Sequence, residues 1–296
     1  MKVSVTVSGL SRLFGKDLAA VVDVARMADD AGIDQIVMPD HLAMGTRTDR
    51  YPFGTFPYPP EEPWLEPLSV LAAMASATRR VRLATGVLIG PLRSALDVAR
   101  SVATIDVLSR GRFDLGIGTG WQREEFTDKA LPFVGRTARM DDMVRACRAL
   151  WEQEPPVSFS SDSVELSDLW CEPRPVQRRV PVFFGGGAND ATARRIVELG
   201  DGWLPLGVPE HDVGRFVDRL RNEYVERGRD PATLGVRMTI RVVTDDAGDA
   251  DIRATLAPLP HLAALGVTAI TVALGRFIRT RSDIGAFLRD LAMART

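Results

Sequence analysis

The sequence predicts a single α/β domain built as a (β/α)8 (TIM) barrel. Strand-like and helix-like segments alternate along all 296 residues, eight of each, and such alternation is typical of parallel strands joined by helices. The strand segments 81–89 and 267–274 are nearly continuous apolar or β-branched runs, as expected for strands buried on both faces. A doubly wound sheet with a second domain would need a linker, and no Pro- or Ser-rich linker is found. We therefore expect one domain over residues 1–296.

The first strand and helix show the pattern most plainly. The segment KVSVTVSG, residues 2–9, reads as a strand. The stretch 17–32 has apolar residues at the spacing of one helical face, and Gly32 is a typical helix stop. That face consists of Leu18, Val21, Val22, Ala25 and Ala28. The second strand is expected at 33–40.

The same alternation continues to the end of the chain. Further strands are expected at 81–89, 112–118, 180–184, 201–206, 235–243 and 267–274. Further helices are expected at 66–78, 94–109, 139–152, 190–199, 210–227, 249–265 and 282–293.

Composition and charge exclude several classes of protein. Lys and Arg number 37 against 39 Asp and Glu, so no overall basic field exists to hold nucleic acid or an anionic membrane. No apolar run is long enough to span a bilayer. The two cysteines form no disulfide framework, and a cytoplasmic location is the simplest expectation. The three histidines lack metal-binding spacing, so no metal site is predicted.

Two connections are too long to be simple barrel turns, and they form loop insertions after the second and fourth strands. Residues 42–64, called the aromatic loop below, leave the carboxyl end of the second strand, where barrel enzymes place their active sites. We expect Tyr51, Phe53 and Trp64 to line a substrate pocket, although aromatics here would also serve simply to cap the barrel. The second insertion, 155–179, alternates weakly and is interpreted as a β-hairpin.

A glycine-rich run, GRFDLGIGTGWQREEF, ends the strand at 112–118. It resembles a dinucleotide-binding fingerprint, but the glycine spacing is wrong and the run follows the fourth strand rather than the first. Gly118 and Gly120 are better explained by close approach of a flat ring over the strand end.

A second glycine cluster, VPVFFGGGAND, lies between a strand and a helix. Amides at a helix N-terminus favour an anionic phosphate, and glycines let it come close. We therefore expect Gly185, Gly186 and Gly187, with the adjoining Ala188, to bind a cofactor phosphate. A tight turn with a helix cap is the alternative. Asp190 would repel phosphate unless its carboxylate points outward.

Taken together and in order, four segments resemble the luciferase-like monooxygenase superfamily, and within it the deazaflavin (coenzyme F-420)-dependent branch. They are MPDHLAMG, VRLATGVLIGPLRS, DVLSRGRFDLGIGTGWQREEF and CEPRPVQRRVPVFFGGGANDATARRIVELGDGW. The resemblance covers essentially the whole chain. It implies a TIM barrel that holds a flavin or deazaflavin at its carboxyl face, hydride or oxygenase chemistry on a small organic substrate, and a homodimer.

The resemblance also implies roles for particular residues. A non-proline cis peptide is expected at Gly86–Val87 or Val87–Leu88, beneath the cofactor ring, with Thr85 beside it. A plain β-bulge there is the alternative. The Asp40–His41 pair is expected beside the ring, with His41 as the acid/base and Asp40 as its orienting group or a ring contact.

Histidine changes charge near neutral pH, which suits it to the proton step that accompanies hydride transfer. The alternative is a histidine that is packed at a strand end and hydrogen-bonded to the backbone. Glu124 is either catalytic or an ion-pair partner of Arg136 or Arg139. Some sugar-phosphate-oxidising members have Glu at the position of Trp121, so we expect Trp121 to line the substrate pocket instead.

Three functions remain open at this stage. The first is hydride transfer with coenzyme F-420, the second is FMN-dependent monooxygenation with oxygen, and the third is non-catalytic flavin binding. The Asp40–His41 pair and the segment at Gly86 favour the first. Arg276, Arg279 and Arg281 either bind the polyglutamate tail of coenzyme F-420 or form a solvated basic loop.

Overall fold

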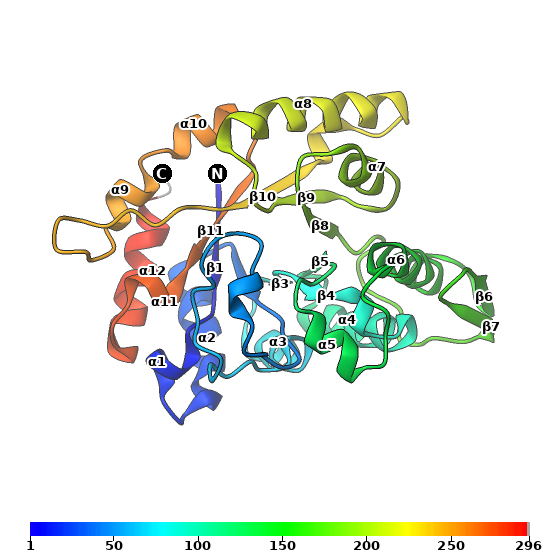
Figure 1. The fold of residues 1–296 in the computed structure, drawn as a ribbon, viewed down its shortest axis with the longest axis horizontal. Helices are drawn as coiled ribbons and strands as arrows, with labels where there is room; N and C mark the ends of the chain where they lie inside the picture. Colours follow the sequence, from blue (N-terminus) through cyan, green and yellow to red (C-terminus); the bar gives the residue numbers. More distant parts are fainter. Residues whose placement is uncertain (295–296) are drawn as a thin grey trace.

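The computed structural model describes residues 1–294 and shows a closed parallel barrel (Figure 1). The sheet order is β3-β2-β1-β11-β10-β9-β8-β5-β4, and β3 also pairs with β5, which closes the sheet. The predicted barrel is therefore confirmed. Its strands are β1 Lys2–Thr6, β2 Gln35–Met38, β3 Arg82–Thr85, β4 Leu88–Ile89, β5 Phe113–Gly118, β8 Val182–Gly186, β9 Gly202–Pro205, β10 Gly235–Thr239 and β11 Ala269–Ala273.

Helices lie around the outside of the strands (Figure 1). The strands are buried on both faces, as the apolar runs predict; β5 is buried at all six positions. The longer helices are α2 Val21–Ala31, α3 Pro67–Ala77, α4 Ala95–Ser109, α6 Arg136–Glu152, α7 Asp190–Leu199, α8 Glu210–Glu226 and α12 Ile284–Met293. The shorter ones are α1 Leu10–Phe14, α5 Arg123–Asp128, α9 Ile252–Leu256, α10 Leu259–Ala264 and α11 Leu274–Phe277.

The structure corrects three predicted elements. The strand expected at 81–89 is interrupted between β3 and β4, where the Gly86–Val87 peptide bond is cis. The strand expected at 235–243 ends at Thr239. The helix expected at 249–265 divides into α9 and α10, because Pro258 and Pro260 start a new helix rather than continue the old one.

The second insertion is a β-hairpin, as the sequence suggests. Strands β6 Val157–Ser160 and β7 Glu165–Leu169 pair antiparallel and project from the side of the barrel, at the right edge of Figure 1. The hairpin lies next to α6 and away from the barrel mouth. It therefore contributes nothing to the cavity described below.

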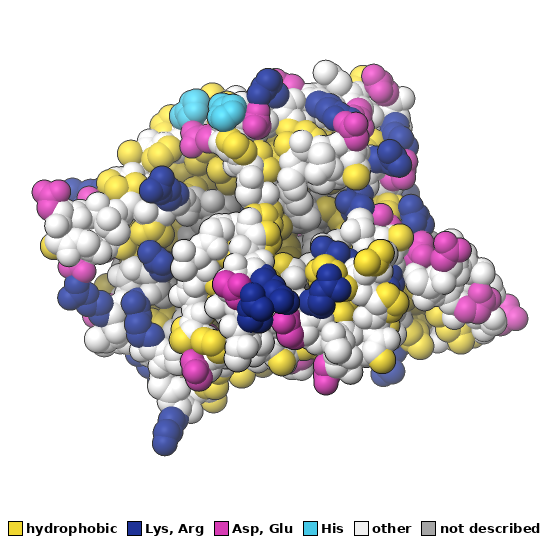
Figure 2. All heavy atoms as spheres, in the orientation of Figure 1, with side chains coloured by type: hydrophobic (Ala, Val, Ile, Leu, Met, Phe, Trp, Pro, Cys, Tyr) yellow, Lys and Arg dark blue, Asp and Glu magenta, His cyan; other side chains and the backbone are white. Residues whose placement is uncertain are grey.

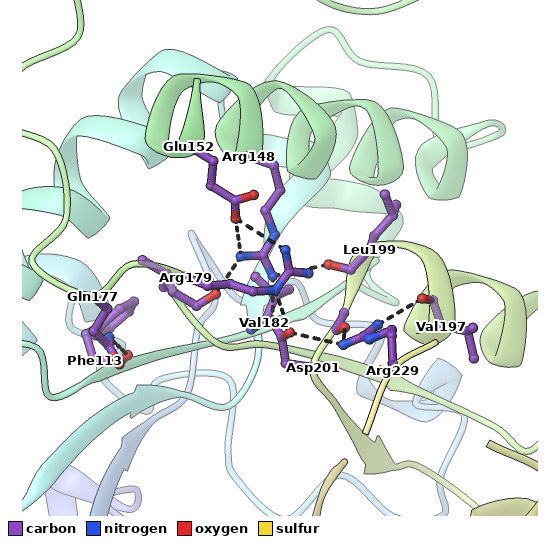
Figure 3. Close-up of polar contacts among 12 residues, drawn as sticks. Phe113, Arg148, Glu152, Gln177, Arg179, Val182, Val197, Leu199, Asp201 and Arg229 are labelled. Atoms are coloured by element: carbon purple, nitrogen blue, oxygen red, sulfur yellow. Dashed lines mark hydrogen bonds and ion pairs between the residues drawn. The ribbon is translucent and has the colours of Figure 1, made fainter. Parts of the chain in front are cut away.

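Paired charges surround a cavity of about 740 Å³ at the amino end of the barrel. Asp201, directly before β9, accepts hydrogen bonds from Arg148 at 2.5 Å and Arg179 at 2.7 Å, and Arg229 lies 3.3 Å away (Figure 3). Burial by itself would raise the pKa of Asp201, but the charges of Arg148 and Arg179 outweigh burial and hold this pKa below its ordinary value. These contacts join α6 and the start of β9, and they stabilise the fold.

Candidate active site

A cavity of about 370 Å³ lies at the carboxyl end of the barrel. The ends of β2, β3, β5, β8 and β9 form its base, and the aromatic loop covers it. Figure 2 shows the surface hollowed beside this loop, with hydrophobic side chains visible inside. The residues selected from the sequence that line it are Asp40, His41, Tyr51, Phe53, Trp64, Gly86, Val87, Gly118, Gly120, Trp121, Gly185 and Gly186. Most of the residues selected from the sequence thus line one cavity.

His41 lies at the centre of the aromatic part of this cavity. Its ring meets the ring of Trp64 edge-on, with centroids 4.7 Å apart. The rings of Trp121 and Phe56 lie farther away, with centroids at 5.9 and 6.0 Å. Aromatic pairs prefer this edge-to-face arrangement. These rings, two from the aromatic loop and Trp121 from the segment after β5, therefore hold the imidazole ring in place.

The carboxylate that faces His41 is Glu125, which the sequence analysis did not select. The Nδ1 atom of His41 lies 3.3 Å from both Glu125 oxygens, and the Glu125 side chain is fully buried. Glu125 also accepts a 2.7 Å hydrogen bond from the backbone N–H of Leu42. Within residues 1–294 the opposite nitrogen, Nε2, has no hydrogen-bond partner, so it is the atom that His41 can offer to a ligand.

Asp40 does not hydrogen-bond to His41, although it lines the cavity and its predicted contact with the ring stays a prediction. Its two oxygens accept hydrogen bonds from Arg93 at 2.6 and 2.9 Å, and Oδ2 also accepts the N–H of Ile89 at 2.8 Å. The Asp40 side chain is fully buried. A bidentate pair of this kind fixes geometry, so Asp40 ties the end of β2 to β4 and does not orient His41.

Gln122 is a second buried residue that the sequence analysis missed. Its Oε1 accepts the N–H of Gly45 at 2.7 Å and its Nε2 donates to the carbonyl of Ala43 at 2.6 Å. Together with Glu125, it attaches the first residues of the aromatic loop to the segment after β5. The base of the loop is therefore fixed.

Gly86 and Val87 form a ledge in the cavity beside His41. The predicted cis peptide is present between them. Thr85, predicted to touch the cofactor, instead lies fully buried beneath the ledge and donates its Oγ1–H to the carbonyl of Gly116 at 2.6 Å. It supports the ledge from below.

Gly118 and Gly120 line the cavity, but the reason for glycine differs from the one expected. A Cβ atom at Gly118 would lie 2.7 Å from the Val87 side chain, and one at Gly120 would lie 2.7 Å from Ile89. Gly120 also has a φ of +71°, which disfavours other residues. These glycines make room for the side chains of Val87 and Ile89, and so they shape the cavity wall without having to contact a ligand themselves.

The turn between β8 and α7 presents unpaired backbone donors. Among the described residues, the N–H groups of Gly187, Ala188 and Ala191 donate no hydrogen bond, and a Cβ at Gly187 would meet only Asn189, at 3.5 Å. Asn189 caps the helix by accepting the N–H of Thr192 at 3.0 Å. Gly187 and Ala188 do not line the cavity; they lie just beyond Gly186, at its edge.

The carboxylate of Asp190 does not prevent an anion from binding at this turn. Its carboxylate is 84% exposed and forms an ion pair with Arg219 of α8 at 2.6 Å. The difficulty raised by the sequence is thereby removed, because the charge points away from the free N–H groups.

Arg136 is the cation that lines the cavity. Its Nε donates to the carbonyl of Gly120 at 3.2 Å, and its guanidinium lies 3.8 Å from the centre of the Phe133 ring. Within residues 1–294 it has no ion pair with a carboxylate. Burial and then the charge of Arg123 lower the pKa of Arg136. An uncompensated cation of this kind favours an anionic ligand.

Three charged groups from the sequence analysis lie elsewhere. Glu124 pairs with Arg50 at 3.5 Å, not with Arg136 or Arg139, and does not line the cavity. Arg281 pairs with Asp17 and Asp23, and Arg279 pairs with Asp249. Two of the three arginines proposed for a cofactor tail are therefore already neutralised.

The sequence matches the luciferase-like monooxygenase family over residues 3–288. The chain belongs to this family. It is 30% identical over 274 residues to an uncharacterized protein of Mycobacterium tuberculosis, and the match covers 90% of this chain and 91% of that protein.

Two further relatives use different cofactors. An F-420-dependent glucose-6-phosphate dehydrogenase of Amycolatopsis mediterranei is 30% identical over 188 residues, 62% of this chain and 52% of the relative. An FMNH2-dependent dimethylsulfone monooxygenase of Pseudomonas putida is 28% identical over 166 residues, 55% and 45% of the two chains. The family therefore contains both F-420- and FMN-dependent enzymes.

Solved structures agree on the fold. A monooxygenase from Streptomyces bottropensis superimposes with a TM-score of 0.79 at 20% identity, covering 99% of this chain and 98% of the other. The coenzyme F-420-dependent tetrahydromethanopterin reductase from Methanopyrus kandleri gives 0.68 at 16% identity, with the same two coverages. Residues 1–294 contain no helix with the length and apolar character needed to cross a membrane.

Proposed function

We propose that this protein is an oxidoreductase that transfers a hydride between coenzyme F-420 and a small organic substrate. The observation that supports this most is the His41–Glu125 pair beside the Gly86–Val87 ledge. A histidine held on one side by a buried carboxylate and open on the other is suited to exchange a proton at Nε2. When bound, the deazaflavin supplies the two-electron acceptor or donor.

The residues at the barrel mouth fit such a cofactor. Its ring would lie on the ledge formed by Gly86 and Val87, beside Gly118. Its phosphate would lie between Arg136 and the free N–H groups at Gly187 and Ala188, because a cation and a helix N-terminus both favour an anion.

The chain's own part in the reaction is positioning and proton transfer. Glu125 fixes the orientation of the imidazole and stabilises its charged form when His41 takes a proton. Trp64, Trp121 and Phe56 exclude water, so the proton is exchanged with the substrate rather than with solvent. Substrate oxidation would release a proton to Nε2, and substrate reduction would take one from it.

An FMN-dependent monooxygenase is the second candidate. The enclosure of the cavity by the aromatic loop favours it, since a reduced flavin that reacts with oxygen must be protected from water. In that reaction His41 would supply the proton that oxygen reduction requires. Glu124, exposed and paired with Arg50, is not assigned a role in either reaction.

Titration of the protein with coenzyme F-420 and with FMN, followed by absorbance and fluorescence, tests the proposal. We expect coenzyme F-420 to bind in the micromolar range and FMN to bind more weakly. Tight binding of FMN alone would replace the proposal with the second candidate. Binding of neither cofactor would contradict both.

A further inference from the structure

Arg237 of β10 lies inside the barrel, directly beneath the candidate cofactor site. Its side chain is almost completely buried. Nη2 donates to the carbonyl of Thr85 at 3.0 Å, and Nη1 donates to Oε1 of Gln35 at 2.5 Å. Both acceptors are neutral. The guanidinium therefore brings a full positive charge into the barrel without a carboxylate in direct contact within residues 1–294.

The nearest acid does not cancel this charge. Asp114 is reached from Arg237 only through Gln35, whose Nε2 donates to Asp114 at 2.6 Å. Asp114 is itself neutralised by Arg82, with contacts of 2.5 and 3.0 Å. The next carboxylate, Asp106, is joined to this network only through Gln177, on the far side of Arg82. Arg237 is therefore the member of the network that has no carboxylate in direct contact among the described residues.

The Arg237 guanidinium lies immediately below the floor of the cavity. A Cβ atom built on Gly86, which lines the cavity, would be 3.6 Å from Nη2 of Arg237. One built on Gly116 would be 3.0 Å from the same nitrogen. Only the Thr85–Gly86 backbone separates the guanidinium from a ring that rests on the ledge.

Protonation of Arg237 persists in these surroundings. Burial lowers its pKa to about 10. At neutral pH the guanidinium is still charged. Arg237 also lines a cavity of about 740 Å³ at the amino end of the barrel. Toward the cofactor site, however, only protein backbone lies in between, so solvent screens its field less in that direction.

We propose that Arg237 raises the reduction potential of the cofactor bound above it. This rests on the proposed function, because it requires a redox ring on the Gly86–Val87 ledge. A hydride carries two electrons and one proton, so the ring that accepts it gains one negative charge until a further proton follows. A fixed cation beneath the ring stabilises that charge and so favours the reduced form.

The alternative is that Arg237 only fills and cross-links the barrel interior. The two roles separate when charge and hydrogen bonding are changed independently. Arg237→Lys keeps the charge but loses a donor, whereas Arg237→Gln keeps a donor to the Thr85 carbonyl and loses the charge. If Arg237 is only structural, the two variants should differ in stability but not in the reduction potential of the bound cofactor. If it acts through its charge, the reduction potential should follow the charge at position 237.

The experiment is a spectroscopic redox titration of bound coenzyme F-420, and of bound FMN, against reference dyes in the wild type and both variants. In Arg237→Gln the preference for the reduced over the oxidised cofactor should fall roughly tenfold, which equals about 30 mV for a two-electron couple. In Arg237→Lys it should stay within threefold. Equal potentials in all three proteins would overturn the proposal.

Asp114→Asn provides a second test with the opposite sign, and it keeps the proposal falsifiable if Arg237→Gln does not fold. Removing this carboxylate leaves the buried network more positive, so the reduced form should be favoured further. A potential that falls or does not move would contradict the proposal. Failure of wild-type protein to bind either cofactor would instead contradict the proposed function, so the two failures are distinguishable.

Discussion

Asp201 at the amino end of the barrel and Arg136 at the carboxyl end differ in whether they have an oppositely charged partner. At the amino end, Asp201 is surrounded by arginines and Asp114 is paired with Arg82. At the carboxyl end, Arg136 has no acidic partner and His41 leaves one nitrogen free. Paired groups stabilise the fold and offer nothing to a ligand, whereas unpaired groups at a cavity are available for binding and proton transfer.

From this difference we infer, without reference to relatives, that the carboxyl end is the candidate for ligand binding. Both ends are rich in charged residues, so the number of charges does not distinguish them. What distinguishes them is that Arg136 lines the carboxyl-end cavity without an acidic partner among the described residues, whereas Asp201 and Asp114 at the amino end are both paired with arginines. The substitutions below test this comparison by removing groups from one end or the other.

The largest effect is expected from His41→Ala. Loss of a general acid or base should lower turnover by on the order of 10²–10⁴, measured as hydride transfer between coenzyme F-420 and small organic substrates. Cofactor affinity should stay within roughly tenfold, or about 1.4 kcal/mol. His41→Gln is the matched control, because it keeps a hydrogen bond to Glu125 but cannot exchange a proton; its turnover should fall as well. Unchanged turnover in either variant would make His41 structural.

At the amino end, Asp201→Asn should destabilise the fold by about 3 kcal/mol, because it leaves several arginines together without their carboxylate. Urea unfolding measures this. Cofactor affinity should not change. Asp190→Asn is the control: its exposed pair with Arg219 should contribute less than about 1 kcal/mol. Equal stability of the two variants would contradict the assignment of the amino end to stabilisation.

The stabilising contribution of Asp201 is expected to depend on pH. The pKa of Asp201 is lowered in the folded state, so its stabilising contribution is complete above its unfolded pKa, about 3.9, and is lost as pH falls through the folded value. The difference in unfolding free energy between wild type and Asp201→Asn should therefore be constant from pH 7 to about pH 5 and shrink below about pH 4. A difference that grows on acidification would reverse the assigned sign.

A smaller effect is expected from Arg136→Met. Loss of a charge-assisted contact costs about 1.5–3 kcal/mol, so FMN affinity should fall by roughly ten- to a hundredfold. Affinity for riboflavin, which lacks the phosphate, should be nearly unchanged. Isothermal titration of both ligands separates these outcomes. Equal losses for the two ligands would place the phosphate away from Arg136.

The smallest effect is expected from Glu125→Gln. The amide still fits against His41 and can accept the Leu42 N–H, but it no longer stabilises a charged imidazole. Turnover should fall by roughly tenfold, less than in His41→Ala. If Glu124→Gln lowered turnover more than Glu125→Gln, the choice of carboxylate would be wrong.

The sequence predicted the barrel and most of the cavity because both depend on local patterns. Apolar strands, glycine clusters and the Asp40–His41 motif are visible along the chain. Glu125 was missed in favour of Glu124 because adjacent residues on a short helix point in different directions. Only the packing of α5 against the aromatic loop determines which one faces His41.

Charge pairing was the least predictable feature. Nothing near Arg136 in the sequence shows that it lacks an acid, and nothing near Arg281 shows that Asp17 and Asp23 are its partners, more than 250 residues away. Such pairs form between elements that are distant along the chain. For the same reason the position of Arg237 could not be predicted, because it contacts Thr85 and Gln35 only when the barrel closes.

The central claim is that the carboxyl-end cavity holds the cofactor beside His41. The chain has three histidines, and the other two, His211 on α8 and His261 on α10, are exposed. NMR of protein labelled with 15N-histidine, with His41→Gln to assign the signals, follows each ring during titration with coenzyme F-420. The account predicts that the His41 signals shift and those of His211 and His261 do not. Saturable cofactor binding with no change at His41 would contradict it.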